Sequence, residues 1–257
     1  MKPPDREQRA PLILAVDTSA KITSLAIAQG AQILAEFTGD SDEKRSEKLW
    51  TEIGALLADA GYGINDVDLY AVCVGPGGFT GLRVGVAAVK GYAAAAGKPV
   101  VGVTSLEAAA FAAGPTPVVC AMVNAYKGEV FAQQFAFDAA GAPVPLSEPI
   151  VAPAEQILER VAALDDVLFA GSGAIENLER IRQAGGEKFR EAPGNSGWRV
   201  AQPAALAAGR IAQLALIKFQ RGEAESAESL RACYVRPSDA EIKLSQGLIG
   251  AKKMRDA

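Results

Sequence analysis

The strongest constraint on the fold of this chain is an order of strands and helices that occurs twice. Three short apolar segments joined by tight turns come first, followed by a helical pattern, a buried strand and a second helical pattern. After Gly114-Pro115-Thr116-Pro117 the same order starts again. Short strands joined by tight turns indicate an antiparallel meander. A meander followed by helix, strand and helix, used twice, predicts two similar lobes that face each other across a cleft.

Actin, the sugar kinases and Hsp70 have this layout. We therefore predict an α/β fold of the two-lobed actin-like (ASKHA, ribonuclease H-like) type, a duplication with mixed sheets flanked by helices. The 257 residues are enough for two lobes, each with a core of its own. The expected organisation is a disordered tail over 1–11, an N-terminal lobe over 12–115, a C-terminal lobe over 116–222 and a C-terminal extension over 223–257.

No histidine is present anywhere in the sequence, which excludes every chemistry that needs a histidine-bound metal or a histidine base. The three cysteines, Cys73, Cys120 and Cys233, form no CxxC pair, so a zinc ribbon and a dithiol redox motif are excluded as well. Cys73 and Cys120 lie in apolar runs, and we expect them to be buried core residues. The formal net charge of −4 argues against a protein that binds nucleic acid by itself.

Two features predict a cytoplasmic protein with no membrane contact. The N-terminal segment is charged and proline-rich, and it lacks the apolar core of a signal peptide. The longest alanine- and valine-rich segment, residues 84–103, is interrupted by Lys90, Lys98 and Pro99, so we do not expect it to span a bilayer.

Two short polar turns are candidates for a degenerate nucleotide site. Asp17-Thr18-Ser19 ends the first strand, where hydroxyl and N–H groups could face phosphates and the carboxylate could orient a hydrated magnesium ion. Gly171-Ser172-Gly173 ends a strand of the second lobe and could approach an adenosine. Each also has a structural interpretation, a polar β-turn for the first and a helix cap for the second. Residues 124–130 are either the second lobe's counterpart of the Asp17 turn or a simple hairpin.

A glycine-rich segment, residues 75–81, connects a buried strand to a helix. It is not a P-loop, because GxxxxGK[ST] is absent, and it suits either an anion at the helix N-terminus or a tight connection. In the helix that follows, Gly81, Gly85 and Ala88 form a row of small residues. Glycine inside a helix costs about 0.5–1 kcal/mol relative to alanine. Something must therefore pack very close to this row, either the protein's own sheet or a helix of a partner.

Five motifs in this order resemble the TsaB family of bacterial tRNA threonylcarbamoyladenosine biosynthesis proteins. The most specific is the glycine segment that runs into Leu82-Arg83-Val84-Gly85. The others lie at residues 13–19, 97–103, 127–130 and 234–237. The resemblance covers residues 12–240 and implies the actin-like two-lobed fold.

The resemblance also implies a function. TsaB-like proteins are non-catalytic dimerisation subunits of the complex that forms N6-threonylcarbamoyladenosine in the anticodon loop of ANN-decoding tRNAs. Their partners are a TsaD-like catalytic subunit and a TsaE-like ATPase. By this resemblance the chain forms a homodimer when alone, contacts tRNA only through the complex, and has no cofactor of its own, with ATP or ADP acting only in the complex.

The family's first two helices, here residues 44–60 and 80–96, form the bundle used for homodimer and heterodimer contacts. Their apolar rows are therefore our predicted partner interface. The predicted interface residues are Leu49, Ile53, Leu56, Phe79, Leu82, Arg83, Gly85, Val86 and Val89.

The chain departs from its relatives at positions that bear on catalysis. The catalytic relative carries a pair of metal-binding histidines four residues apart, which fall at Ser105 and Ala109 here. Arg45 and Asn124 stand where family members often have histidine and aspartate. We therefore predict no catalytic residue and no metal site in this chain.

A second function stays open from the sequence. An actin-like ATPase or small-molecule kinase acting on its own would use Asp17 to orient magnesium. No second well-placed carboxylate is evident in the glycine-rich turns to support it. A glycoprotease is disfavoured, because the chain has no histidine and no nucleophile elbow.

Overall fold

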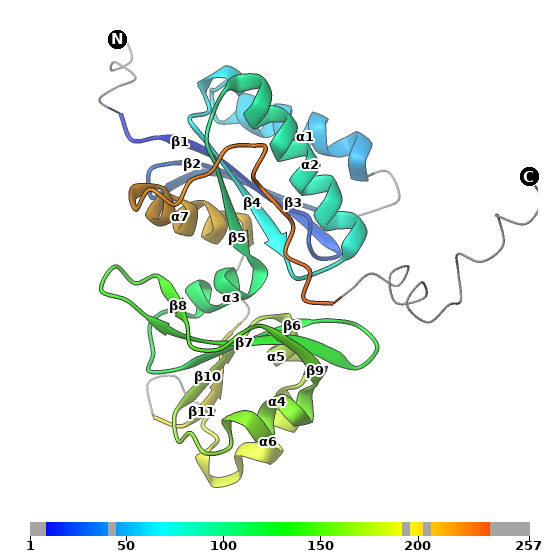
Figure 1. Cartoon of the computed structure of the whole chain (residues 1–257), viewed down its shortest axis with the longest axis vertical. Coiled ribbons are helices and arrows are strands. Elements are labelled where there is room, and N and C mark those ends of the chain that lie inside the picture. The colour runs from blue at the N-terminus through cyan, green and yellow to red at the C-terminus, as the bar shows by residue number, and fades with distance from the viewer. Residues whose placement is uncertain (1–8, 41–44, 192–195, 203–206, 237–257) are drawn as a thin grey trace, which may run out of the picture.

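The structure is a computed structural model that describes residues 9–40, 45–191, 196–202 and 207–236, and it has two lobes (Figure 1). The upper lobe in Figure 1 contains a five-stranded sheet in the order β3-β2-β1-β4-β5. The first three strands are antiparallel, as the meander pattern predicts, and β4 and β5 continue the sheet in parallel with β1. The strands are β1 (Leu12–Asp17), β2 (Ile22–Gln29), β3 (Gln32–Asp40), β4 (Leu69–Gly75) and β5 (Val100–Thr104).

Helices cover both faces of this sheet. On one face lie α1 (Arg45–Asp59) and α2 (Phe79–Ala96), with the short η1 (Ile64–Asp66) between them in sequence. On the other face lies α7 (Ala207–Gln220), whose apolar side packs on β1, β2, β4 and β5. The side chains of β1 alternate between the two layers, so every residue of that strand is buried.

The lower lobe has a six-stranded mixed sheet in the order β11-β10-β6-β7-β8, with β9 also paired to β7. One face carries α4 (Ala154–Val161), α5 (Ser172–Glu176) and α6 (Leu178–Gly185), followed by η2 (Gly186–Lys188). The other face carries α3 (Ser105–Ala113). The strands are β6 (Val119–Asn124), β7 (Glu129–Phe137), β8 (Pro143–Pro145), β9 (Ile150–Pro153), β10 (Val167–Ala170) and β11 (Trp198–Val200).

The two-lobed fold is confirmed, but the predicted lobe boundaries are wrong for two helices. The boundary at 116–222 assigns α7 to the C-terminal lobe, whereas α7 packs on the N-terminal sheet. The boundary at 12–115 assigns α3 to the N-terminal lobe, whereas Leu106 and Ala110 of α3 pack with β6 and β7. Each half of the chain thus supplies a helix that covers the sheet of the other half, which ties the lobes together.

The C-terminal extension packs mainly on the N-terminal lobe. We call residues 223–236 the strap; it runs along α2 and β5 and then reaches the lower lobe (Figure 1). Glu225 and Val100 exchange two backbone hydrogen bonds, and Cys233 N donates to Val74 O at 2.7 Å. At its end Arg236 forms an ion pair with Glu129 of β7. The remainder of the predicted extension, and the predicted tail up to residue 8, lie outside the described residues.

The cysteines of the two sheets are core residues, as predicted. Cys73 of β4 and Cys120 of β6 are both buried. Burial raises the pKa of the Cys73 thiol well above its usual range and that of Cys120 to about 12, so both stay neutral near pH 7. Within the described part of the chain, no helix is long and apolar enough to cross a membrane.

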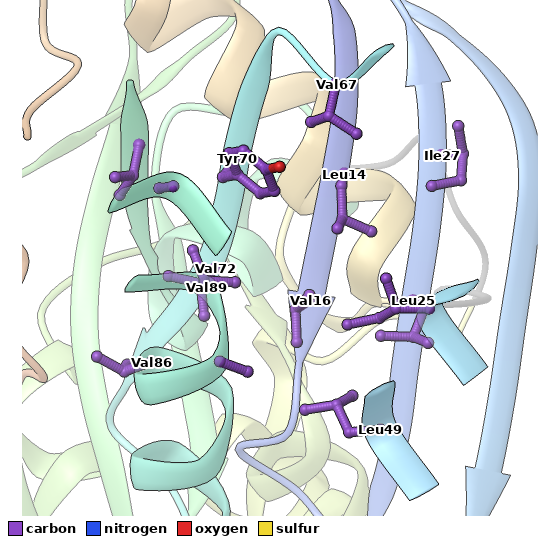
Figure 2. Close-up of a cluster of buried hydrophobic side chains, with 14 of the residues drawn as sticks. Leu14, Val16, Leu25, Ile27, Leu49, Val67, Tyr70, Val72, Val86 and Val89 are labelled. Atoms are coloured by element: carbon purple, nitrogen blue, oxygen red, sulfur yellow. The ribbon is translucent and has the colours of Figure 1, made fainter. Parts of the chain in front are cut away.

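One buried polar group lies in the core beneath α1 and α2. Tyr70 of β4 is fully buried, with its hydroxyl pointing toward Leu14 and Val67 (Figure 2). Its ring stacks on Tyr92 of α2, with centroids 6.2 Å apart and an interplanar angle of 7°. The hydroxyl has no hydrogen-bond partner in the part of the chain that the structure describes. Burial, with Tyr92 nearby, raises the pKa of Tyr70 to about 12.

Replacement of this hydroxyl tests the packing directly. We expect Tyr70→Phe to raise the free energy of unfolding by about 1 kcal/mol, because a buried hydroxyl without a partner costs about 1–3 kcal/mol. Tyr62→Phe is the matched control, since the Tyr62 hydroxyl bonds to Gln29 Oε1 at 3.2 Å and its loss should destabilise. Urea unfolding measures both variants. A Tyr70→Phe protein that unfolds more easily than the wild type would show that the hydroxyl is satisfied.

Candidate functional site

The turn after β1 is closed on itself. Asp17, Thr18 and Ser19 are only 6%, 1% and 7% exposed. The Ser19 N–H donates to Asp17 Oδ1 at 2.8 Å, which is the local bond of an Asx turn. The three residues predicted to face a nucleotide thus lie inside the lobe, and the Asp17 carboxylate organises its own turn.

Residues 75–81, which we call the glycine loop, fill the space in front of this turn. Gly78 N donates to Ser19 O at 2.7 Å, and Thr18 Oγ1 donates to Gly81 O at 2.7 Å. A Cβ atom at Gly77 would lie 2.6 Å from Ser19 O, closer than such contacts occur. The glycine loop therefore serves close backbone packing, as the tight-connection interpretation of the sequence expects.

The row of small residues on α2 packs against the same turn. A Cβ atom at Gly85 would lie 2.3 Å from Thr18 Oγ1. Gly81 and Ala88 of this row are buried as well. What packs so close to α2 is therefore the protein's own sheet and not a partner helix.

The second predicted triplet is engaged in the other lobe. A Cβ atom at Gly171, which has a φ of 96°, would lie 2.5 Å from Met122 O. Ser172 begins α5, and its Oγ accepts a hydrogen bond from Asn124 N at 3.2 Å. The first triplet thus forms the end of β1, and the second contacts the end of β6 in its own lobe.

The predicted partner interface is wrong for most of its residues. Figure 2 shows Leu49 near Val16 and Val89 near Val72, and Val86 belongs to the same buried cluster. The helical periodicity was a sign of burial in the chain's own core. Only Phe79, which is half-buried, and Arg83, which is exposed, lie outside it. The predicted interface residues that the structure buries are Leu49, Ile53, Leu56, Leu82, Gly85, Val86 and Val89.

Ser105 stands at one of the two positions where the catalytic relative has its histidine pair, and here it has a structural role. Ser105 Oγ donates to Pro76 O at 2.5 Å and so holds the glycine loop. A capping box begins α3: Thr104 Oγ1 accepts from Glu107 N, and Glu107 Oε2 accepts from Thr104 N. Glu107 also forms an ion pair with Lys218 of α7 at 2.6 Å. Among the described residues, no group of three or more metal-ligating side chains is placed to hold an ion.

A cavity that the sequence did not predict lies between the lobes. Its volume is about 480 Å³, and it is bordered by the glycine loop, the β6–β7 turn and the strap. Its lining includes Phe79, Tyr126, Lys127, Tyr234 and Arg236. These residues come from three distant parts of the chain, so no local motif marks them. One signal was present: Lys127 and Arg236 both lie in motifs shared with the TsaB family.

Comparison with known proteins identifies the family. Residues 24–192 match the family model of TsaD, tRNA N6-adenosine threonylcarbamoyltransferase. YeaZ from Pseudomonas aeruginosa, a TsaB protein, superposes with a TM-score of 0.69 at 27% identity, over 87% of this chain and 99% of that one. The chain belongs to the TsaB branch of the TsaD family. EutJ from Carboxydothermus hydrogenoformans, with a TM-score of 0.50 at 12% identity, shares only the actin-like fold.

Curated members of the TsaD family match over part of their length. TsaB from Haemophilus influenzae is 33% identical over 125 residues, which are 48% of this chain and 52% of that protein. The tRNA N6-adenosine threonylcarbamoyltransferase of Thermodesulfovibrio yellowstonii is 33% identical over 111 residues, 37% of this chain and 33% of that protein. The match thus spans about half of the TsaB relative and a third of the transferase.

The contact between the turn after β1 and α2 leads to a prediction about stability. Gly85→Ala should lower the free energy of unfolding by about 1–3 kcal/mol, because the new methyl group overlaps Thr18 Oγ1. In a Thr18→Ala background the nearest remaining atom is the Cβ of residue 18 at 3.5 Å, so most of this loss should disappear.

Gly54→Ala on α1 is the control for this pair. No atom lies within 4 Å of a Cβ at Gly54, so this change should stabilise the helix by about 0.5–1 kcal/mol. Urea denaturation of Gly85→Ala, Thr18→Ala, the double variant and Gly54→Ala measures the free energy of unfolding of each. The first three, with the wild type, give the coupling energy between residues 18 and 85. If Gly85→Ala is as harmless as Gly54→Ala, the close contact with Thr18 does not exist.

Proposed function

We propose that this chain is the non-catalytic dimerisation and scaffold subunit of the complex that forms N6-threonylcarbamoyladenosine in the anticodon loop of ANN-decoding tRNAs. Its partners in this proposal are a TsaD-type catalytic subunit and a TsaE-type ATPase. It has no cofactor of its own, and ATP or ADP acts only in the complex. Similarity to both TsaB and TsaD proteins supports a place in this pathway.

The observation that carries the non-catalytic role is the closed turn after β1. Catalysis by Asp17 would need its carboxylate to reach a bound phosphate or metal. Here the carboxylate accepts the Ser19 N–H, and the glycine loop packs over Thr18 and Ser19. The polar groups of this turn are thus satisfied by the chain itself, and the absence of histidine from the sequence supports the same conclusion.

The partner surface that we propose is the outward face of α1 and α2. Trp50 is 47% exposed there, and its ring lies 4.6 Å from that of Tyr92 and beside Gly91. Exposed tryptophan is typical of interface centres, and small neighbours allow a second helix to approach closely. We call this surface the outer helix face; its exposed residues are Glu47, Trp50, Gly54 and Ala58 of α1 and Thr80, Arg83, Ala87, Gly91 and Ala94 of α2.

The same face can serve the homodimer and the heterodimer. Helices of the two subunits would pack as a bundle, with the methyl groups and glycines of α2 at the closest approach. A homodimer of the isolated chain would then compete with the catalytic subunit for one surface. This competition makes assembly sensitive to a single bulky charge on that face.

Ala87→Arg tests the surface. Ala87 is exposed in the middle of the outer helix face, so the change should leave the fold intact. It should weaken association with the TsaD-type subunit about 100-fold or more, because the new charge would be buried without a partner. Ala184→Arg on α6, an equally exposed alanine of the other lobe, is the matched control and should assemble normally. Size-exclusion chromatography of each variant with the catalytic subunit measures the outcome.

Two results would count against the proposal. If Ala87→Arg assembles as well as Ala184→Arg, the outer helix face is not the partner surface. ATP turnover by the purified chain alone, lost in Asp17→Ala, would instead favour a self-standing actin-like ATPase or small-molecule kinase.

A further inference from the structure

We infer that the cavity between the lobes receives an unstacked nucleotide of the substrate RNA while the chain is part of the complex. This inference rests on the proposed function, and it adds a binding site to a subunit whose role is otherwise assembly. The ligand class follows from the cavity's own chemistry, which combines aromatic rings with cations.

Aromatic rings from three parts of the chain meet at this cavity. Phe79 at the start of α2 and Tyr234 of the strap have ring centroids 5.0 Å apart with an angle of 40°. Tyr126 lies on the β6–β7 turn, and Tyr126 and Tyr234 are both 46% exposed. Exposed rings beside a cavity are stacking platforms for splayed bases of single-stranded RNA.

Cations accompany these rings. The Arg83 guanidinium lies over the Phe79 ring at 3.8 Å from its centroid, and Arg83 Nε donates to the Tyr234 hydroxyl at 3.4 Å. Lys127 and Arg236 line the cavity, and Glu129 is the carboxylate that pairs with Arg236. Lys127 and Arg236 thus line the cavity and Arg83 lies over its Phe79 ring, although the whole chain has a net charge of −4. Arginine and lysine beside stacking platforms are the usual partners of the RNA backbone.

The β6–β7 turn holds two of these side chains at a conformational cost. Tyr126 and Lys127 have φ values of 61° and 56°, in the left-handed region that glycine and asparagine tolerate and other residues rarely adopt. The turn itself is closed by backbone bonds from Ala125 N to Glu129 O and from Glu129 N to Tyr126 O. Neither bond needs a tyrosine ring or a lysine. Strain of this kind is typical of functional positions.

The surroundings favour a nucleotide over a peptide. A peptide commonly binds by adding a strand to an open sheet edge. The strands that lead into the turn, β6 and β7, are each paired on both sides, with β10, β8 and β9 as the outer neighbours. A volume of about 480 Å³ is instead within the range of small-ligand sites.

The test uses the double variant Tyr126→Asn/Lys127→Asn in the reconstituted complex with the TsaD-type subunit. Asparagine suits the left-handed turn, so the variant should melt no lower than the wild type. Fluorescence anisotropy with a labelled RNA hairpin that has an unpaired loop should show about tenfold weaker binding, because one stacking ring and one cation are gone. Binding of a loop-free RNA duplex should change less than twofold. Phe219→Asn/Lys188→Asn removes an exposed ring and a lysine elsewhere and should bind the hairpin as the wild type does.

Several outcomes would overturn the inference. Hairpin binding equal to the wild type, or an equal loss for hairpin and duplex, would show that no nucleotide enters the cavity. Displacement of the hairpin from this cavity by ADP would assign the site to a free nucleotide. Failure of the double variant to bind the TsaD-type subunit would assign the site to a protein partner. If the wild-type chain does not assemble with that subunit, the proposed function fails and the inference falls with it, whereas an assembled complex whose hairpin binding the double variant leaves unchanged overturns the inference alone.

Discussion

The arrangement of the N-terminal lobe depends on one contact, between the turn after β1 and the start of α2. Thr18 bonds to the backbone of Gly81 and lies against Gly85, so α2 approaches the sheet without an intervening side chain. This contact fixes the glycine loop over Asp17 and Ser19. It also sets which face of α2 points outward, and it positions Phe79 and Leu82 at the border of the cavity. Closure of the turn, the outward orientation of α2 and the border of the cavity thus share one cause.

Much of the fold could be predicted from the sequence, because most strands and helices have a local pattern, although three-residue strands such as β8 and β11 have too few residues to show one. The exchange of α3 and α7 between the lobes could not. An apolar stripe such as Leu106 and Ala110 shows that one side of a helix is buried, but it does not show which sheet buries it. The glycine row had the same ambiguity. Only the structure shows that Thr18, far away in sequence, occupies the space in front of Gly85.

The partner surface that we propose illustrates a related limit. The periodic row with Leu49, Val86 and Val89 is the strongest signal on α1 and α2, and it marks the core. The outward face carries small residues, a few polar ones and a single tryptophan, which produce almost no hydropathy signal. The cavity was missed for a different reason. Tyr126 lies on the β6–β7 turn and Tyr234 lies on the strap. They line the same cavity only because the strap returns along α2.

Asp17 holds the turn after β1, and we infer that it performs no chemistry. The most direct test is Asp17→Asn in the complete reconstituted complex, with threonylcarbamoyladenosine quantified by mass spectrometry of digested tRNA. Asparagine keeps the Oδ1 acceptor for the Ser19 N–H and removes the charge. We expect product to form at the wild-type rate. A fall of about 100-fold or more in an assembled complex would show that the carboxylate takes part in catalysis and would contradict the scaffold role.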